Sequence, residues 1–207
     1  MKIIVANQKG GAGKTTHAIL LSNYLSIIKK ENIIAIDMDF QSTFHSIWQE
    51  DKKTFDNSSP YEVIDIELEE SNGLIEKIKD VDGHVVIDLP GKIDDNNLIP
   101  IIQAADLIVT PFSYDRKSFT ATHLFSQVVR HLNADVPIVF IPNRLKAGVN
   151  YLTKQQSNSA LEEFGEIAPI FSDRIAYQRI DTVSINQEVE EQITKSYNFI
   201  YDKYLNQ

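Results

Sequence analysis

The sequence predicts an α/β protein with a mostly parallel, twisted sheet and helices on both faces of that sheet. The main observation is that short apolar runs alternate with longer helix-like segments along the chain. The composition, with 43% hydrophobic and 24% charged residues, is typical of a globular protein. A length of 207 residues suits one domain covering residues 1–207.

Short runs rich in Ile, Val and Leu, bounded by polar or glycine residues, predict buried strands. The predicted strands comprise residues 2–7, 32–38, 61–66, 84–89, 106–111, 137–142 and 167–170. The predicted helices between them comprise residues 15–30, 42–50, 67–79, 118–131 and 151–164. Ser42 is the predicted N-cap of the second helix, because its hydroxyl can accept a hydrogen bond from a free backbone N–H.

The C-terminal segment predicts one more helix with a single apolar stripe. Its apolar residues at positions 185, 189, 193, 197, 200 and 204 recur in steps of 4, 4, 4, 3 and 4. Ser184 and Gln187 have the spacing of a capping box at the start of this helix. We expect Tyr197, Tyr201 and Tyr204 to face the core.

The composition also excludes several classes of protein. The absence of cysteine excludes disulfides, thiolate metal sites and iron–sulfur clusters. The longest uncharged stretch near the N-terminus has 14 residues, whereas a membrane span needs about 18–20 apolar residues. No signal peptide is recognisable, so we expect a cytoplasmic protein.

The loop after the first strand carries the strongest functional signal. Three of the eight glycines, Gly10, Gly11 and Gly13, fall within four positions of it. Such a loop can turn backbone N–H groups toward an anion, and the following helix directs its positive end to the same place. Lys14 adds a charge for the β and γ phosphates, and Thr15 supplies a hydroxyl for Mg²⁺.

The segment 9–16, KGGAGKTT, resembles the deviant Walker A motif of the ParA/MinD family of P-loop ATPases. The resemblance implies a P-loop NTPase fold and a nucleotide site formed by Lys9, Gly10, Gly11, Ala12, Gly13, Lys14, Thr15 and Thr16. In that family the first lysine, here Lys9, reaches across a dimer interface to the phosphates of the partner's ATP. An ATP-sandwich homodimer and the cofactors ATP and Mg²⁺ are therefore implied.

Two acids end the second predicted strand and face the same side of it, because side chains alternate along a strand. The segment DMDFQ at 37–41 is similar to the family's D-x-D-P-Q motif, with Phe40 in place of the usual proline. By this resemblance Asp39 positions or activates the attacking water, and Asp37 helps to order the Lys14 and Mg²⁺ region. Lys9, Lys14 and Asp39 are thus the predicted catalytic residues.

Asp88 ends an apolar strand in the manner of a Walker B motif. Thr15, Asp39 and Asp88 are the predicted contacts of Mg²⁺, with Asp88 acting through water. Asn143 ends a later strand, where the family usually contacts adenine. Its amide can offer both a donor and an acceptor to a base edge, although an ordinary turn residue is the other interpretation.

The resemblance is strongest to short ParA-type partition proteins. Such proteins dimerise on ATP, bind DNA without sequence preference, and release it after slow hydrolysis that a centromere-binding adaptor stimulates. We expect the ATP-bound form to associate with the nucleoid. A membrane-binding relative is disfavoured, because the C-terminal helix carries more acids than bases.

The net charge of −9 makes the chain a poor bulk ligand for nucleic acid. No acid occurs between residues 136 and 161, however, so a local basic face is possible. Candidate DNA contacts are Arg174, Arg179, Arg144 and Lys146, and a solvated surface is the other interpretation.

The alternative function is an ATP-dependent positioning or regulatory adaptor that binds proteins and not DNA. Residues 56–76 carry seven acids and no base. This stretch could meet a basic partner or simply form a solvated helix face.

Overall fold

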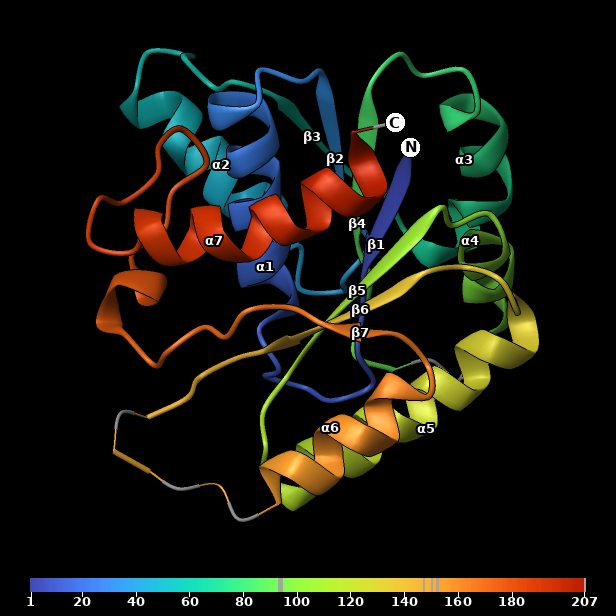
Figure 1. Ribbon diagram of the computed structural model, residues 1–207. Helices are drawn as coiled ribbons and strands as arrows, with labels where there is room; N and C mark the ends of the chain where they lie inside the picture. Colours follow the sequence, from blue (N-terminus) through green and yellow to red (C-terminus); the bar gives the residue numbers. More distant parts are fainter. Residues whose placement is uncertain (93–94, 147, 150, 152, 207) are drawn as a thin grey trace.

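The computed structural model describes residues 1–92, 95–146, 148–149, 151 and 153–206, apart from the side chain of residue 72. Within this part of the chain the strands form one seven-stranded sheet in the order β3-β2-β4-β1-β5-β6-β7 (Figure 1). Every pair of neighbouring strands is parallel. The strands are β1 (Lys2–Val5), β2 (Ile33–Asp37), β3 (Glu62–Asp65), β4 (His84–Asp88), β5 (Leu107–Phe112), β6 (Ile138–Pro142) and β7 (Glu166–Ile167). The predicted fold class is confirmed.

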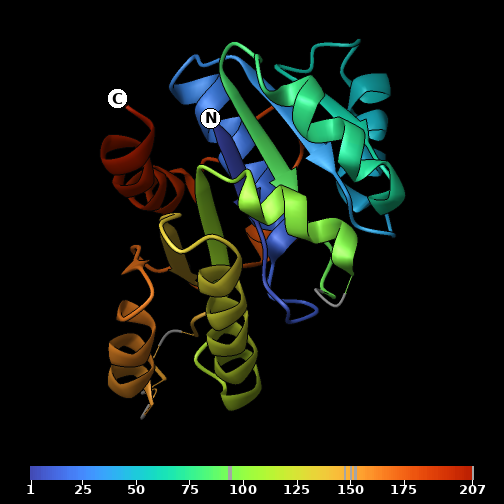
Figure 2. The same ribbon diagram turned by 90° about the vertical axis from the view of Figure 1, so that its right-hand side faces the viewer.

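Helices cover both faces of the sheet, as Figures 1 and 2 show. One face carries α1 (Lys14–Asn23), α2 (Thr43–Thr54) and α7 (Glu190–Ile200), and the other carries α3 (Ser71–Ile78), α4 (Ile99–Gln103), α5 (Arg116–Leu132) and α6 (Lys154–Glu162). Successive side chains of a strand point to opposite faces of the sheet, so the strands contribute to the core on each face. In β1, Ile3 and Val5 pack into the first and Ile4 packs into the second.

Several elements differ from the prediction in extent or type. The helix expected over 15–30 is α1 followed by a π-helical turn at Tyr24–Ile28, and another π-helical turn, Tyr201–Leu205, continues α7. Short 3₁₀ turns occur at Leu68–Glu70, Asn96–Leu98 and Ile175–Gln178. The prediction missed α4, a five-residue helix that directly follows the 3₁₀ turn at Asn96–Leu98. Residue 152, inside the predicted helix 151–164, lies outside the described residues.

The prediction that Ser42 caps α2 through its side chain is wrong. Ser42 precedes α2 but has a left-handed backbone with φ of 44° and makes no side-chain cap bond. Its Oγ instead donates to the carboxylate of Asp65, at 2.9 Å from Oδ1. The carboxylate of Asp37 caps the helix, because its Oδ2 accepts from the backbone N of His45 at 3.1 Å.

The predicted capping box of Ser184 and Gln187 is also not formed. The helix α7 begins at Glu190, six residues after Ser184. Ser184 is held by Asp181, whose Oδ1 accepts from the Ser184 backbone N and whose Oδ2 accepts from the Ser184 hydroxyl. The apolar stripe itself is confirmed, since Val189, Ile193, Tyr197 and Ile200 are buried. Tyr201 and Tyr204 are partly buried against the same core.

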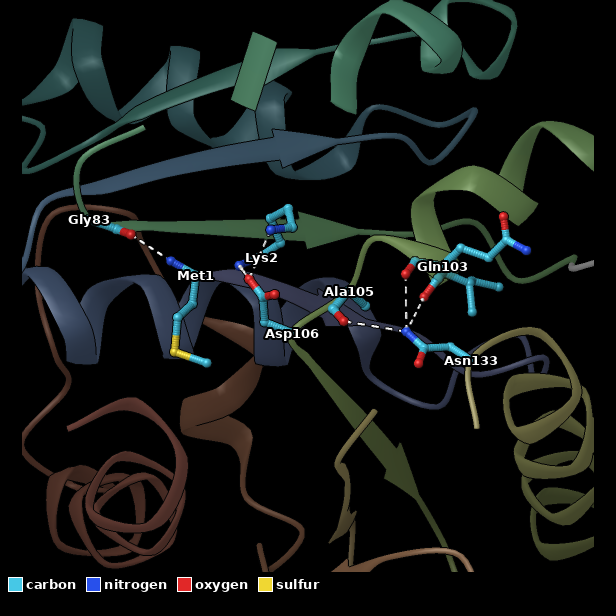
Figure 3. Close-up of polar contacts among 8 residues, drawn as sticks. Met1, Lys2, Gly83, Gln103, Ala105, Asp106 and Asn133 are labelled. Atoms are coloured by element: carbon cyan, nitrogen blue, oxygen red, sulfur yellow. Dashed lines mark hydrogen bonds and ion pairs between the residues drawn. The ribbon is translucent and has the colours of Figure 1, made fainter. Parts of the chain in front are cut away.

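The amino-terminal edge of the sheet is joined by polar contacts between segments far apart in sequence (Figure 3). The terminal amine of Met1 donates to the carbonyl of Gly83 at 2.7 Å. The Nζ of Lys2 lies 3.0 Å from Oδ2 of Asp106. The side-chain amide of Asn133 donates to the carbonyl of Gln103 at 3.1 Å and so caps the end of α4. A cavity of about 650 Å³ lies at this edge, lined by both acids and bases and remote from the glycine-rich loop.

No helix among the described residues is both long enough and apolar enough to cross a membrane.

Candidate functional site

The glycine-rich loop joins β1 to α1 at the carboxyl edge of the sheet. Gly11 and Gly13 have φ angles of +73° and +99°, which are backbone conformations that residues with a β-carbon rarely adopt. The loop closes on itself through the Ala12 backbone N, which donates to the carbonyl of Lys9. Because α1 starts at Lys14, its free N–H groups and positive dipole end face the loop. This arrangement suits a phosphate group.

Asn7 anchors the beginning of this loop, a role that the motif did not predict. Its side chain is fully buried, and its Nδ2 donates to the carbonyl of Pro111 and to Thr122 Oγ1, both at 2.8 Å. Its Oδ1 accepts from the backbone N of Lys9 at 3.0 Å. The position of Lys9 is therefore tied to β5 and α5.

Asn143 holds the other end of the loop. Its Nδ2 donates to the carbonyl of Ala12 at 3.0 Å, and its Oδ1 accepts from the backbone N of Arg144. A β-carbon at Gly13 would lie 2.4 Å from this Nδ2. Asn143 thus supports the loop in this structure, and its predicted contact with adenine stays a prediction.

Lys14 begins α1 and is buried within the loop. Its Nζ lies 3.4 Å from the place that a β-carbon would take at Gly91, beyond the end of β4. The ammonium group therefore lies close to the backbone at position 91. The predicted contact of Lys14 with the phosphates of a nucleotide stays a prediction.

Thr15 and Asp88 meet beside the loop, as the prediction required. The Thr15 hydroxyl donates to Asp88 Oδ2 at 2.6 Å. The other carboxylate oxygen, Oδ1, is buried and has no hydrogen-bond partner among the described residues. A buried carboxylate oxygen without a donor calls for a cation or an ordered water.

This donor set fits Mg²⁺. No group of three His, Cys, Asp or Glu side chains that could hold a metal occurs among the described residues. Mg²⁺ does not need one, because it commonly takes one or two protein oxygens and completes its octahedron with water and substrate phosphates. Thr15 and Asp88 are the residues that would hold it, Asp88 directly or through water.

Burial raises the pKa of Asp88 to about 7. The hydrogen bond from Thr15 and the charge of Lys14 lower that pKa, whereas the charges of Asp37 and Asp39 raise it. Burial therefore favours the protonated form of this carboxyl group. A cation at this place would favour its ionised form.

Asp37 and Asp39 have different surroundings although they lie two residues apart. Asp37 is fully buried, and its carboxylate accepts from the backbone N of Asp39 and of His45. Burial raises its pKa, and these two N–H groups oppose the rise. The Asp39 carboxylate is partly exposed and accepts only from the backbone N of Gln41, at 3.2 Å, among the described residues. Asp37 therefore holds the turn, and Asp39 remains available to a water or a ligand.

A cavity of about 240 Å³ opens beside Thr16, at the end of the loop away from these carboxylates. Three chain segments form it: the first turn of α1, the end of β6 and the segment before α7. It is lined by Thr16, Asn143, Arg144, Ser172, Asp173, Arg174, Tyr177 and Gln178. The lining offers hydrogen-bond donors and acceptors and one aromatic ring, that of Tyr177, which are groups that a nucleoside could contact.

Residues 3–179 match the model of the CobQ/CobB/MinD/ParA nucleotide binding domain. The match covers most of the chain and includes the loop, Asp88 and all residues that line the cavity beside Thr16. The chain belongs to this family. Its members bind nucleotides, and the loop described above is the part of this chain suited to that task.

Individual relatives of this ParA/MinD family protein include a maintenance of carboxysome distribution protein A from Gloeobacter kilaueensis. The two are 33% identical over 111 residues, which are 53% of this chain and 47% of that protein. The match thus spans about half the length of that relative.

Two solved structures show the same fold. A plasmid partition protein from Borrelia burgdorferi bound to AMPPNP aligns with a TM-score of 0.78 and 20% identity, over 98% of each chain. The ParA of pNOB8 bound to nonspecific DNA aligns with a TM-score of 0.61 and 19% identity, over 78% of this chain and 74% of that one.

The predicted DNA contacts fall into two groups. Arg144 and Arg174 line the cavity beside Thr16, and the Arg174 guanidinium is held by Ser172 Oγ at 3.2 Å and by the carbonyl of Glu188 at 3.3 Å. Lys146 and Arg179 are exposed and are not among the residues described as lining that cavity. Sequence reasoning missed Ser172 and Tyr177 as cavity residues, because no motif marks them.

Proposed function

We propose that this protein is a partition-type ATPase that dimerises on ATP, binds DNA without sequence preference, and hydrolyses ATP to drive the segregation of plasmid or chromosomal DNA. The observation that carries the ATPase part is the 2.6 Å bond between Thr15 and Asp88 beside a loop with two positive-φ glycines. The AMPPNP-bound relative and the family match support a nucleoside triphosphate as the ligand.

In this proposal the loop N–H groups and Lys14 bind the phosphates, and Thr15 and Asp88 hold Mg²⁺. The bound ion would neutralise charge on the β and γ phosphates. Asp39 accepts a hydrogen bond from the attacking water and orients it, because its carboxylate is accessible and lightly bonded. Catalysis then consists mainly of positioning and charge stabilisation.

Lys9 completes the site from a second copy of the chain. Its backbone is fixed by Asn7, while its side chain forms no ion pair with any described residue. A lysine on a fixed backbone with an unpaired ammonium is suited to reach the phosphates bound by a facing protomer. This supports an ATP-dependent homodimer.

DNA binding rests on exposed cations and on the doubling of contacts in a dimer. Lys146 and Arg179 are the better candidates, because Arg144 and Arg174 border the cavity that suits the nucleoside. The DNA-bound relative supports this mode of action. An adaptor protein would then stimulate a slow ATPase, and the ATP-bound form would associate with the nucleoid.

Size-exclusion chromatography with ADP, with ATP, and with ATP plus duplex DNA tests the proposal. We expect a monomer, a dimer and a DNA-bound dimer in that order, with DNA binding that weakens as salt rises. Lys14→Ala should bind no nucleotide and remain monomeric throughout. ATP-dependent dimers that ignore DNA would instead favour the positioning adaptor, a function that the carboxysome relative supports.

A further inference from the structure

Gln192, on α7, does not line the cavity beside Thr16, but it bonds to two residues that do. Its Oε1 accepts from the backbone N of Ser172 at 3.1 Å and from the hydroxyl of Tyr177 at 2.6 Å. Its Nε2 donates to Ser172 Oγ at 2.8 Å. Ser172 and Tyr177 both line the cavity.

These contacts fix the orientation of the amide. The amide oxygen accepts from the Ser172 backbone N–H and from the Tyr177 phenol, and the Ser172 hydroxyl also lies within hydrogen-bond distance of it at 3.1 Å. Rotating the amide by half a turn would direct its NH₂ group at the Ser172 backbone N–H, which can only donate. One side chain of α7 therefore sets the positions of two cavity residues that lie five positions apart in the chain.

The cavity wall that Gln192 holds is also joined to the loop through the backbone. The Leu145 N donates to the carbonyl of Phe171 at 3.1 Å, and the Asp173 N donates to the carbonyl of Leu145 at 2.8 Å. Asn143, two residues before Leu145, bonds to Ala12 of the loop. Arg174 bonds to Ser172 Oγ, which Gln192 also holds.

We propose that Gln192 is a positioning residue for the nucleoside of the bound nucleotide. It acts by holding Ser172 and Tyr177 in the wall of the cavity and does not touch the phosphates. The inference rests on the proposed function, because it requires that the phosphates occupy the loop and the nucleoside enters the cavity.

The test compares two probes, Mg²⁺ with ATP and Mg²⁺ with inorganic tripolyphosphate, by titration calorimetry. Tripolyphosphate fills the loop but carries no nucleoside. For Gln192→Leu we expect ATP affinity to fall about tenfold, as for the loss of buried hydrogen bonds. Tripolyphosphate affinity should stay within about twofold. Gln192→Glu keeps an acceptor oxygen and should restore most of the ATP affinity.

Ser196→Ala is the matched control. Ser196 lies one turn further along α7, and its Oγ donates to the carbonyl of Pro169, which is not among the described cavity residues. This variant removes a bond between α7 and the chain segment that leads to Ser172. It should leave the ratio of the ATP and tripolyphosphate affinities unchanged. If Gln192→Leu fails to fold, Tyr177→Phe removes only the phenolic donor and should lower ATP affinity about threefold, without effect on tripolyphosphate.

Equal losses for both probes, or no loss for either, would overturn the role of Gln192. A wild-type protein that binds neither probe would overturn the proposed function instead. The two failures are therefore distinguishable.

Discussion

Gly13 and Asn143 show how one distant side chain constrains the phosphate loop. The two residues lie 130 positions apart in sequence, yet the amide of Asn143 occupies the space that a β-carbon at position 13 would need. The left-handed backbone of Gly13 adds a second constraint. The backbone at position 13 thus favours glycine, and a β-carbon there would also displace the Asn143 amide that bonds to Ala12.

Gly13→Ala should lower the free energy of unfolding of the nucleotide-free protein by about 1–3 kcal/mol, from positive-φ strain and the clash with Asn143. Gly10→Ala is the control, because nothing lies within 4 Å of its β-carbon position and its φ is not positive. It should change stability by less than about 0.5 kcal/mol. Urea denaturation measures both, and similar values would contradict the steric argument.

Asp39 differs from its neighbour Asp37 in that the fold depends little on it. Asp37 caps α2 and is buried, whereas Asp39 only closes a turn at Gln41. A residue that contributes little to folding, and whose charge acts on Asp88, is suited to act on a ligand.

Asp39→Ala should therefore retain ATP binding and ATP-dependent dimers while hydrolysis falls about 100-fold or more, the usual effect of removing a general base or water-positioning group. Phosphate release and equilibrium ATP binding are the two measurements. Asp37→Ala should instead destabilise the protein. Unchanged turnover in Asp39→Ala would assign the water to another residue.

At the scale of elements, α1 is joined to α7 through a buried aromatic cluster. His17 Nδ1 lies 2.8 Å from the Tyr197 hydroxyl. The His17 ring packs edge-on against the Phe171 ring, with the two ring centroids 4.7 Å apart. Phe171 directly precedes the cavity residue Ser172. The helix that follows the phosphate loop is thus packed against the segment that forms the cavity wall.

Burial lowers the pKa of His17 from 6.5 to about 4. The unfolded chain therefore binds a proton at this site between these two values and the folded protein does not, so stability falls as pH drops from 6.5 toward 4. His17 alone should contribute a loss of up to about 3 kcal/mol. His17→Gln has no titrating group at this position. The difference in free energy of unfolding between wild type and variant should therefore be smaller at pH about 4.5 than at pH about 7.5. Urea denaturation at both values measures the gap, and a constant gap would contradict a neutral buried His17.

For the whole molecule, the proposed second copy must approach the carboxyl edge of the sheet. Lys9 lies there on an anchored backbone, and so does Phe40, which is 72% exposed. An exposed phenylalanine beside Asp39 is suited to become buried when a facing protomer arrives.

Lys9→Ala should weaken the ATP-dependent dimer at least about tenfold while each monomer still binds ATP, because the lost cation belongs to the facing site. Lys79→Ala is the control, since Lys79 lies at the opposite edge of the sheet beside Met1. Sedimentation with ATP measures the dimer. Normal dimerisation of Lys9→Ala would contradict the role in the facing site.

Local signals predicted most of the elements and the phosphate loop. Short apolar runs, either continuous or alternating with polar residues, predicted the strands. The spacing of the glycines together with Lys14 and Thr15 predicted the loop. The helix α4 was missed because its five residues carry too few turns for a pattern. Ser42 does precede α2 as predicted, but its left-handed backbone leaves it without a side-chain cap bond. Ser184 was misassigned as a cap, because α7 begins six residues after it.

The sequence by itself determined the fold class, the glycine-rich loop, and the acids at the strand ends, because these depend on residue type and on spacing within one segment. Only the tertiary structure decided which groups meet. It placed Thr15 against Asp88, set Asn143 under Gly13, and brought Gln192 to Ser172. Such contacts join segments that the sheet order brings together, and no pattern within one segment encodes the distance between two others.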